Sequence, residues 1–171
     1  VSRGGWTDED LEDRTNEAYG MHERASRLAI AMAPYNANIT RETMKRFEDR
    51  GVYGHHESYA AIPELAIGLA QYMPEVTERL LQEYQECENA DLYTREYKYI
   101  TKLAIALIPN RTDVAERTIS VLEEKGDIGS AVKVALALVP SKSRKAEETI
   151  KKHESEVSYK YSNEIAIAKV F

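Results

Sequence analysis

"LAIALIP", residues Leu103–Pro109, is one of five similar apolar phrases in this chain of 171 residues. The others are LAIAMAP from Leu28, LAIGLAQ from Leu65, VALALVP from Val134 and IAIAKVF from Ile165. The second residue of every phrase is alanine, and proline stands seventh in three of the four complete copies. The starts lie 31 to 38 residues apart, and a recurrence at such intervals indicates a protein built from structural repeats.

The similarity extends over about 20 aligned positions in the four complete copies. A large apolar residue stands sixteen positions after the start of each phrase, and a threonine or leucine precedes it: Thr43–Met44, Leu80–Leu81, Thr118–Ile119 and Thr149–Ile150. Two apolar segments separated by a proline and a polar turn predict a helical hairpin in each copy. The first helix is apolar nearly all round, so stacked neighbouring copies are expected to cover it. Small residues at the second and fourth positions of the phrase would allow these helices to approach closely.

Local signals place several helix ends. The sequence DVAE, Asp113–Glu116, has the form of a capping box, and Ser143 is expected to cap the second helix of the fourth copy. Gly126 followed by Asp127 indicates a helix end and then a new helix start. No segment alternates between apolar and polar residues for long, so no sheet is predicted.

The expected helices lie between longer loops, of which residues 50–58 form the longest. The fourth helix is expected to reach residue 72, with Pro63 near its first turn. The other expected helices span, in chain order, residues 7–18, 21–33, 40–49, 74–88, 92–108, 114–124, 128–139, 144–155 and 163–171. Residues 1–20 are expected to form an acidic lead helix that caps an array over residues 21–171. The copies begin near residues 21, 58, 91 and 127, with a partial fifth from 157. That fifth copy is expected to cap the fourth, to pair with another chain or to continue in a longer protein.

Composition narrows the class of protein. The net charge of −6 and the pI near 5.4 disfavour a dedicated nucleic-acid binder. Cys87 is the single cysteine, so a reducing, cytoplasmic location is expected. No apolar run approaches the roughly 18 residues that a membrane span requires, so no membrane association is predicted.

The segment ALIPNRTDVAERTISVLEEKGD, Ala106–Asp127, resembles a short HEAT-like repeat, and the resemblance covers about Ala25–Phe171. The 31-residue spacings fit the short versions of that family, whereas the spacings of 37 and 38 are longer. The resemblance implies an α-solenoid. It also implies binding of proteins along the face made by the second helices, and some members of the family bind nucleic acid.

Two sets of residues are candidates for a binding surface. The first consists of basic residues on the second helices, which could hold an acidic peptide or a phosphate backbone: Arg79, Arg117, Lys145, Lys151 and Lys152. The second is the pair Tyr93 and Tyr97, which share one helical face, since tyrosine buries area while keeping a polar tip. The alternatives are a mixed-charge solvated surface and tyrosines at the edge of the core.

Neither a catalytic residue, a metal site nor a cofactor is predicted. His55, His56 and Glu57 share one loop but lack the paired spacing of metal ligands, and His22 lies elsewhere. Cys87 has no activating base near it in the sequence. Neither GxGxxG nor GxxxxGK[ST] occurs, so nucleotide binding by these motifs is not supported.

The sequence therefore predicts an all-α protein, an α-solenoid of about four stacked helical hairpins with capping helices at both ends. The alternative fold is a globular helical bundle, in which the copies do not stack in order. The expected function is a non-enzymatic scaffold that binds a protein or peptide. One alternative is a nucleic-acid-associated HEAT-like protein that uses the basic face, and another is an enzyme on an α-solenoid with an unrecognised pocket. Oligomerisation through the C-terminal helix is a further expectation.

Overall fold

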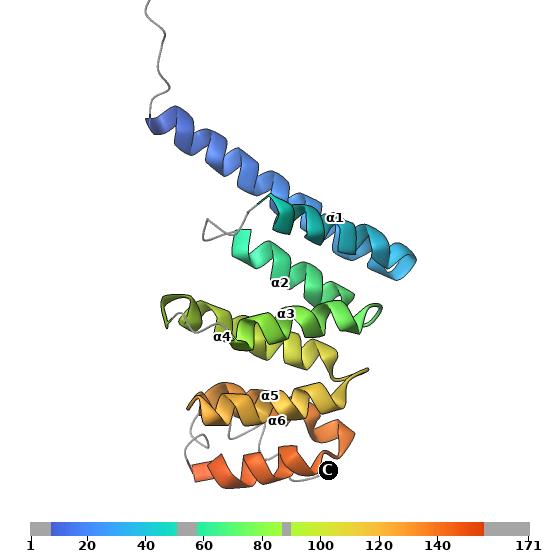
Figure 1. Cartoon of the computed structure of the whole chain (residues 1–171), viewed down its shortest axis with the longest axis vertical. Helices are drawn as coiled ribbons and strands as arrows, with labels where there is room; N and C mark the ends of the chain where they lie inside the picture. Colours follow the sequence, from blue (N-terminus) through green and yellow to red (C-terminus); the bar gives the residue numbers. More distant parts are fainter. Residues whose placement is uncertain (1–7, 51–57, 87–89, 156–171) are drawn as a thin grey trace, which may run out of the picture. The chain divides into compact units, whose positions relative to one another are not determined.

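The computed structural model describes residues 8–50, 58–86 and 90–155, with side chains for 20–50, 61–86 and 99–155. Every regular element in these ranges is a helix, and they contain no strand, which confirms the predicted all-α class (Figure 1). The chain divides into two compact units, Val1–Leu69 and Ala70–Phe171. The partial fifth copy from residue 157 lies outside the described residues.

The first unit begins with α1 (Asp8–Asp49), which folds back on itself at Asn36. Asn36 has φ −158° and ψ 86°, two residues after Pro34, where the seventh position of the phrase predicts a helix end. The segments on either side of this break lie together. The Thr40 hydroxyl donates to the carbonyl oxygen of Ala29 at 2.6 Å. Thus α1 is a helical hairpin, as predicted for the first copy, and Figure 1 shows its turn between blue and teal.

The start of α1 differs from the prediction. A separate lead helix was expected to end near residue 18, but α1 continues through Gly20 without a break. Glycine costs a helix interior only about 1 kcal/mol, so without proline or a capping signal it does not end the helix. The role of residues 1–20 as a cap for the array stays a prediction.

The second helix of this unit, α2 (Ser58–Leu69), packs against α1 and accommodates Pro63 in its first turns. Gly68 occupies the fourth position of its phrase. A Cβ atom added there would lie 3.0 Å from both Cγ1 and Cγ2 of Ile30 in α1. The predicted close approach at this position is therefore present, and α2 ends three residues earlier than expected.

The second unit contains α3 (Pro74–Glu86), α4 (Ala90–Leu107), α5 (Thr112–Glu124), α6 (Ile128–Leu138), a 3₁₀ turn η2 (Val139–Ser141) and a helix over residues 144–155. The ends of α3 to α6, and the start of the last helix at residue 144, fall within two residues of the predicted ones. Helix α4 packs against α3, α5 and α6, and α5 packs against α6. The phrase residues Leu103, Leu107, Val134 and Leu138 are completely buried in this core.

Two of the three predicted capping signals are present. Gly126 has φ +80° at the end of α5, and the Asp127 side chain accepts from the backbone N–H of Ser130 at 3.1 Å. The Ser143 hydroxyl accepts from the backbone N–H of Ala146 at 3.1 Å. The prediction of a capping box over Asp113–Glu116 is wrong, because the N-cap residue of α5 is Arg111, and its side chain makes no capping hydrogen bond.

Candidate functional site

A groove of about 430 Å³ lies between α3 and α5, the second helices of the second and third copies. Its floor consists of Leu81, Val114 and Thr118, each at most 5% exposed, and the side chains of Leu81 and Val114 make it mainly apolar. Polar side chains form the rim. The lining residues are Glu78, Leu81, Gln82, Gln85, Glu86, Val114, Arg117, Thr118 and Val121.

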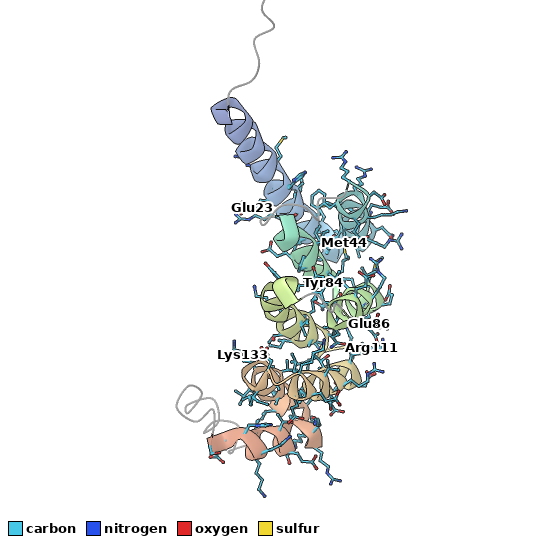
Figure 2. All side chains as sticks on the ribbon, turned by 60° about the vertical axis from the view of Figure 1, so that its left-hand side comes forward. Glu23, Met44, Tyr84, Glu86, Arg111 and Lys133 are labelled. Atoms are coloured by element: carbon cyan, nitrogen blue, oxygen red, sulfur yellow. The ribbon has the colours of Figure 1, made fainter. Side chains whose placement is uncertain are left out.

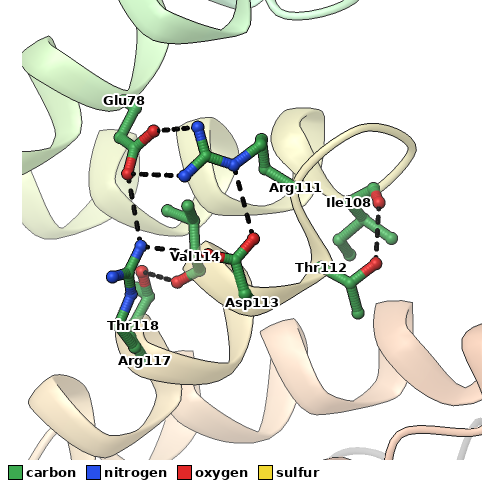
Figure 3. Close-up of polar contacts among 8 residues, drawn as sticks. All are labelled: Glu78, Ile108, Arg111, Thr112, Asp113, Val114, Arg117 and Thr118. Atoms are coloured by element: carbon green, nitrogen blue, oxygen red, sulfur yellow. Dashed lines mark hydrogen bonds and ion pairs between the residues drawn. The ribbon is translucent and has the colours of Figure 1, made fainter.

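Ion pairs join the two walls of the groove at one end (Figure 3). The carboxylate of Glu78 on α3 receives both terminal nitrogens of Arg111, at 2.5 and 3.1 Å. Arg117 donates to the same carboxylate at 3.2 Å. Asp113 bridges the two arginines, with Oδ1 at 3.3 Å from Arg111 Nε and Oδ2 at 3.2 Å from Arg117. The hydrogen bond from Arg111 lowers the pKa of the Asp113 carboxyl, and the same bond raises the pKa of the guanidinium.

Hydrogen bonds without a carboxylate join the walls at the other end. Gln85 on α3 donates its amide N–H to the Thr118 hydroxyl at 3.1 Å, and that hydroxyl donates to the Val114 carbonyl at 2.9 Å. Lys125, which follows α5, donates to the backbone carbonyl of Gln85 at 2.5 Å. The groove is thus held at both ends by contacts between its walls.

The two helices that form the groove are acidic. Each helix contains four carboxylates and one guanidinium, so the residues of each helix sum to a net charge of −3. Glu86 lies on the rim, and its Oε1 accepts from the Gln82 amide at 2.7 Å. In Figure 2 Glu86 and Arg111 lie on one side of the second unit and Lys133 of α6 on the other. Glu78 on this rim is bound by Arg111 and Arg117, so Glu86 is the lining carboxylate that would attract a cationic group.

A second polar cluster joins α5 to the helix over residues 144–155. Glu123, whose side chain is 10% exposed, accepts from Lys145 Nζ at 2.7 Å and Lys152 Nζ at 3.3 Å. His153 Nε2 lies 3.0 Å from its Oε1. Burial raises the pKa of the Glu123 carboxyl, but the hydrogen bonds from Lys145, His153 and Lys152 together outweigh this effect, so the pKa is lowered.

The predicted basic surface is divided among several local contacts. Arg117 lines the groove, whereas Arg79 is not among the lining residues and pairs with Glu83 at 3.5 Å. Lys145 and Lys152 share the carboxylate of Glu123, and Lys151 is exposed. Tyr93 and Tyr97 belong to α4, but their side chains lie outside the described ones.

The sequence alone did not single out Gln82 and Gln85, although a signal for them exists. The chain contains three glutamines, and these two stand three residues apart on one helix. Such spacing places both amides on one face. Their proximity to Val121 and Thr118 depends on packing between helices more than thirty residues apart, which the sequence pattern does not give.

Of the histidine and cysteine candidates, only His22 has a described side chain. His55, His56, Glu57 and Cys87 lie outside the described residues. The ring of His22 packs edge to face against the ring of Phe47, with 5.1 Å between the ring centroids. Within the described ranges no three His, Cys, Asp or Glu side chains lie close enough to hold a metal ion.

Comparisons with known proteins do not identify a family for this chain. No protein-family model, no curated protein and no solved structure matches the chain. The HEAT-like resemblance therefore stays a prediction. Among the helices in the described part of the chain, none combines the length and apolar character that crossing a membrane requires.

Proposed function

We propose that this chain is a non-enzymatic scaffold that binds a short, cationic peptide segment of a partner protein. The groove between α3 and α5 carries the proposal, because it combines an apolar floor with a rim of amides and carboxylates. Small sites of this composition bind an apolar side chain in the floor and use the polar rim to orient its backbone. The amides of Gln82 and Gln85 can each donate and accept, which suits the backbone of an extended peptide.

The proposed setting is a HEAT-like α-solenoid in which the second helices form the binding face. Successive second helices of the second unit support this arrangement through side-chain contacts, since α3 joins α5 through Glu78 and α5 joins the next helix through Glu123. A reducing, cytoplasmic location fits a chain whose only cysteine is Cys87.

Charge selects the class of peptide within this proposal. Glu86 on the rim is exposed and bonded to the neutral Gln82 amide, so a lysine or arginine beside the apolar anchor gains favourable electrostatic energy there. An acidic peptide or a phosphate backbone would need free basic groups. Arg117, Lys145 and Lys152 are instead engaged by Glu78, Asp113 and Glu123, which counts against the nucleic-acid alternative.

The test is selection of peptides from a random twelve-residue display library, followed by fluorescence polarisation with the best binder. Val121→Arg fills the groove with a cationic side chain and should weaken that peptide's affinity about tenfold or more. Lys133→Glu on α6 is the matched control and should leave the affinity within about twofold.

The outcomes separate the hypotheses. Selected peptides that combine lysine or arginine with an apolar residue, and that lose affinity in Val121→Arg, support the proposal. Selected acidic peptides, or equal affinity in the two variants, contradict it. A labelled RNA oligonucleotide whose binding falls steeply with added salt would favour the nucleic-acid alternative instead.

A further inference from the structure

The two carboxylates that line the α3–α5 groove differ in how far the chain already uses their capacity to accept hydrogen bonds. Glu78 accepts from both terminal nitrogens of Arg111 and from Arg117, so two guanidinium groups balance its charge. Glu86 is exposed, and its Oε1 accepts from a neutral donor, the Gln82 amide. Its Oε2 has no partner that the structure describes. The unbalanced negative charge of the groove rim therefore lies at Glu86.

The position of Glu86 on its helix favours a cation for a second reason. Glu86 is the last residue of α3, and the carbonyl groups at the C-terminus of a helix have partial negative charge. One of these carbonyls, that of Gln85, already accepts from the ammonium group of Lys125 at 2.5 Å. The described contacts of Glu86 do not include Lys125, so its carboxylate remains available to a second cation.

Helices α3 and α5 run in the same direction along the two sides of the groove. Glu78 of α3 contacts Arg111 at the start of α5, and Gln85 contacts Lys125 directly after its end. An extended chain laid along the groove therefore passes the ion-paired end at Glu78, then the floor, and then Glu86. The distance between the floor and Glu86 sets the separation of its apolar anchor from its basic residue.

That distance corresponds to two residues of an extended peptide. Leu81 is the residue of α3 in the floor, and Glu86 comes five residues later, about 7.5 Å along the axis at about 1.5 Å per residue. An extended chain advances about 3.3 Å per residue, so side chains two apart are separated by about 6.6 Å and point to the same side. A basic residue one or three from the anchor points away from Glu86, and one four away lies about 13 Å from the anchor.

We propose that Glu86 is the specificity-determining residue of the groove, which recognises an extended segment with a lysine or arginine two residues from its apolar anchor. The spacing rule rests on the proposed peptide-binding function and narrows it from cationic peptides in general to one arrangement of side chains. The anchor packs on Leu81 and Val114, and the basic group of the peptide binds Oε2 of Glu86.

The first test varies the spacing in the peptide. The peptides keep the apolar residue of the tightest binder from the display selection and have a single lysine one, two, three or four residues from it, on either side. Fluorescence polarisation with the full chain should give a dissociation constant about three- to fivefold lower for a two-residue spacing than for the others, the range expected of an exposed ion pair. Equal affinities for the four spacings overturn the rule.

The second test varies the carboxylate. Glu86→Gln should abolish the preference for the two-residue spacing, and Glu86→Lys should instead favour the peptide in which glutamate replaces the lysine. Glu83→Gln is the matched control, because Glu83 is an exposed carboxylate of the same helix that pairs with Arg79 and does not line the groove. The rule is wrong if Glu86→Gln keeps the preference or if Glu83→Gln loses it.

The same measurements separate this rule from the function on which it rests. A selected peptide that loses affinity in Val121→Arg but binds Glu86→Gln as tightly as wild type overturns the spacing rule alone. A library from which no peptide is selected overturns the peptide-binding function and the rule together. Affinity that depends on the two-residue spacing and on Glu86 supports both.

Discussion

Glu78 and Glu116 occupy the same position in successive copies, thirteen residues after the first residue of the phrase, and each accepts from the start of the next copy's second helix. Glu78 binds Arg111 at the N-terminus of α5. Glu116 accepts from the Ser143 hydroxyl at 2.6 Å, at the N-terminus of the helix over residues 144–155. One column of the repeat therefore links each second helix to the one that follows it in the second unit.

Ser143→Ala should lower the free energy of unfolding by about 1 to 2 kcal/mol, because it removes an N-cap and leaves Glu116 without its donor. Ser141→Ala, at an exposed residue of η2, should change it by less than about 0.5 kcal/mol. Urea unfolding followed by circular dichroism measures both. Equal effects of the two substitutions would show that the Ser143–Glu116 contact does not stabilise the fold.

Thr118 and Thr149 share another column, and both are about 1% exposed, but their hydroxyls differ. Thr118 has two hydrogen-bond partners, whereas the Thr149 hydroxyl has none. Thr118→Val should therefore cost about 1 kcal/mol of unfolding free energy, while Thr149→Val should leave it unchanged or raise it by up to about 1 kcal/mol. Urea unfolding measures both variants. A larger loss of unfolding free energy in Thr149→Val than in Thr118→Val would contradict this difference in hydrogen bonding between the two hydroxyls.

Glycine substitutions should differ in sign. Gly68→Ala should cost about 1 kcal/mol or more because its Cβ would meet Ile30, and Ile30→Ala should restore part of that loss. Gly129→Ala in α6 has its nearest atom at 3.9 Å and should stabilise by up to about 1 kcal/mol. Thermal unfolding checks both, and a neutral Gly68→Ala would mean that α1 and α2 separate easily at this point.

The Glu123 cluster should make stability depend on pH in the acid range. The folded pKa of Glu123 is lowered from 4.5, so its contribution is present above that value and is lost as pH falls through the folded pKa. Glu123→Gln should cost about 1 to 2 kcal/mol at pH 7, and this difference from wild type should shrink as pH falls below 4.5. Glu147→Gln, at an exposed residue, is the control. A difference that stays constant down to pH 3 would refute the ionic role of Glu123.

The sequence predicted the helices well because their determinants are local. Pro34 precedes the break in α1, Pro109 and Pro140 follow the last residues of α4 and α6, and Gly126 ends α5. The recurring apolar positions also identified most of the buried residues. Leu28 is the exception among the phrase starts, since its burial depends on a neighbour that the described residues do not supply.

The candidate site was harder to predict because its determinants are far apart in sequence. The motif at Asp113–Glu116 reads as a capping box, yet Asp113 pairs with Arg111 and Arg117, and Glu116 accepts from Ser143, 27 residues away. Basic residues such as Lys145 suggested an open cationic surface. Their carboxylate partners become apparent only once the second helices lie side by side.

The clamped groove constrains how the proposed scaffold could change during evolution. The contacts Arg117–Glu78 and Gln85–Thr118 fix the distance between the groove walls, and the same contacts hold α5 on α3. A substitution at Glu78 or Thr118 that altered peptide preference would also alter stability. New specificity is therefore expected to arise first at Gln82, Glu86 and Val121, which line the groove but do not belong to the contacts described above between its walls.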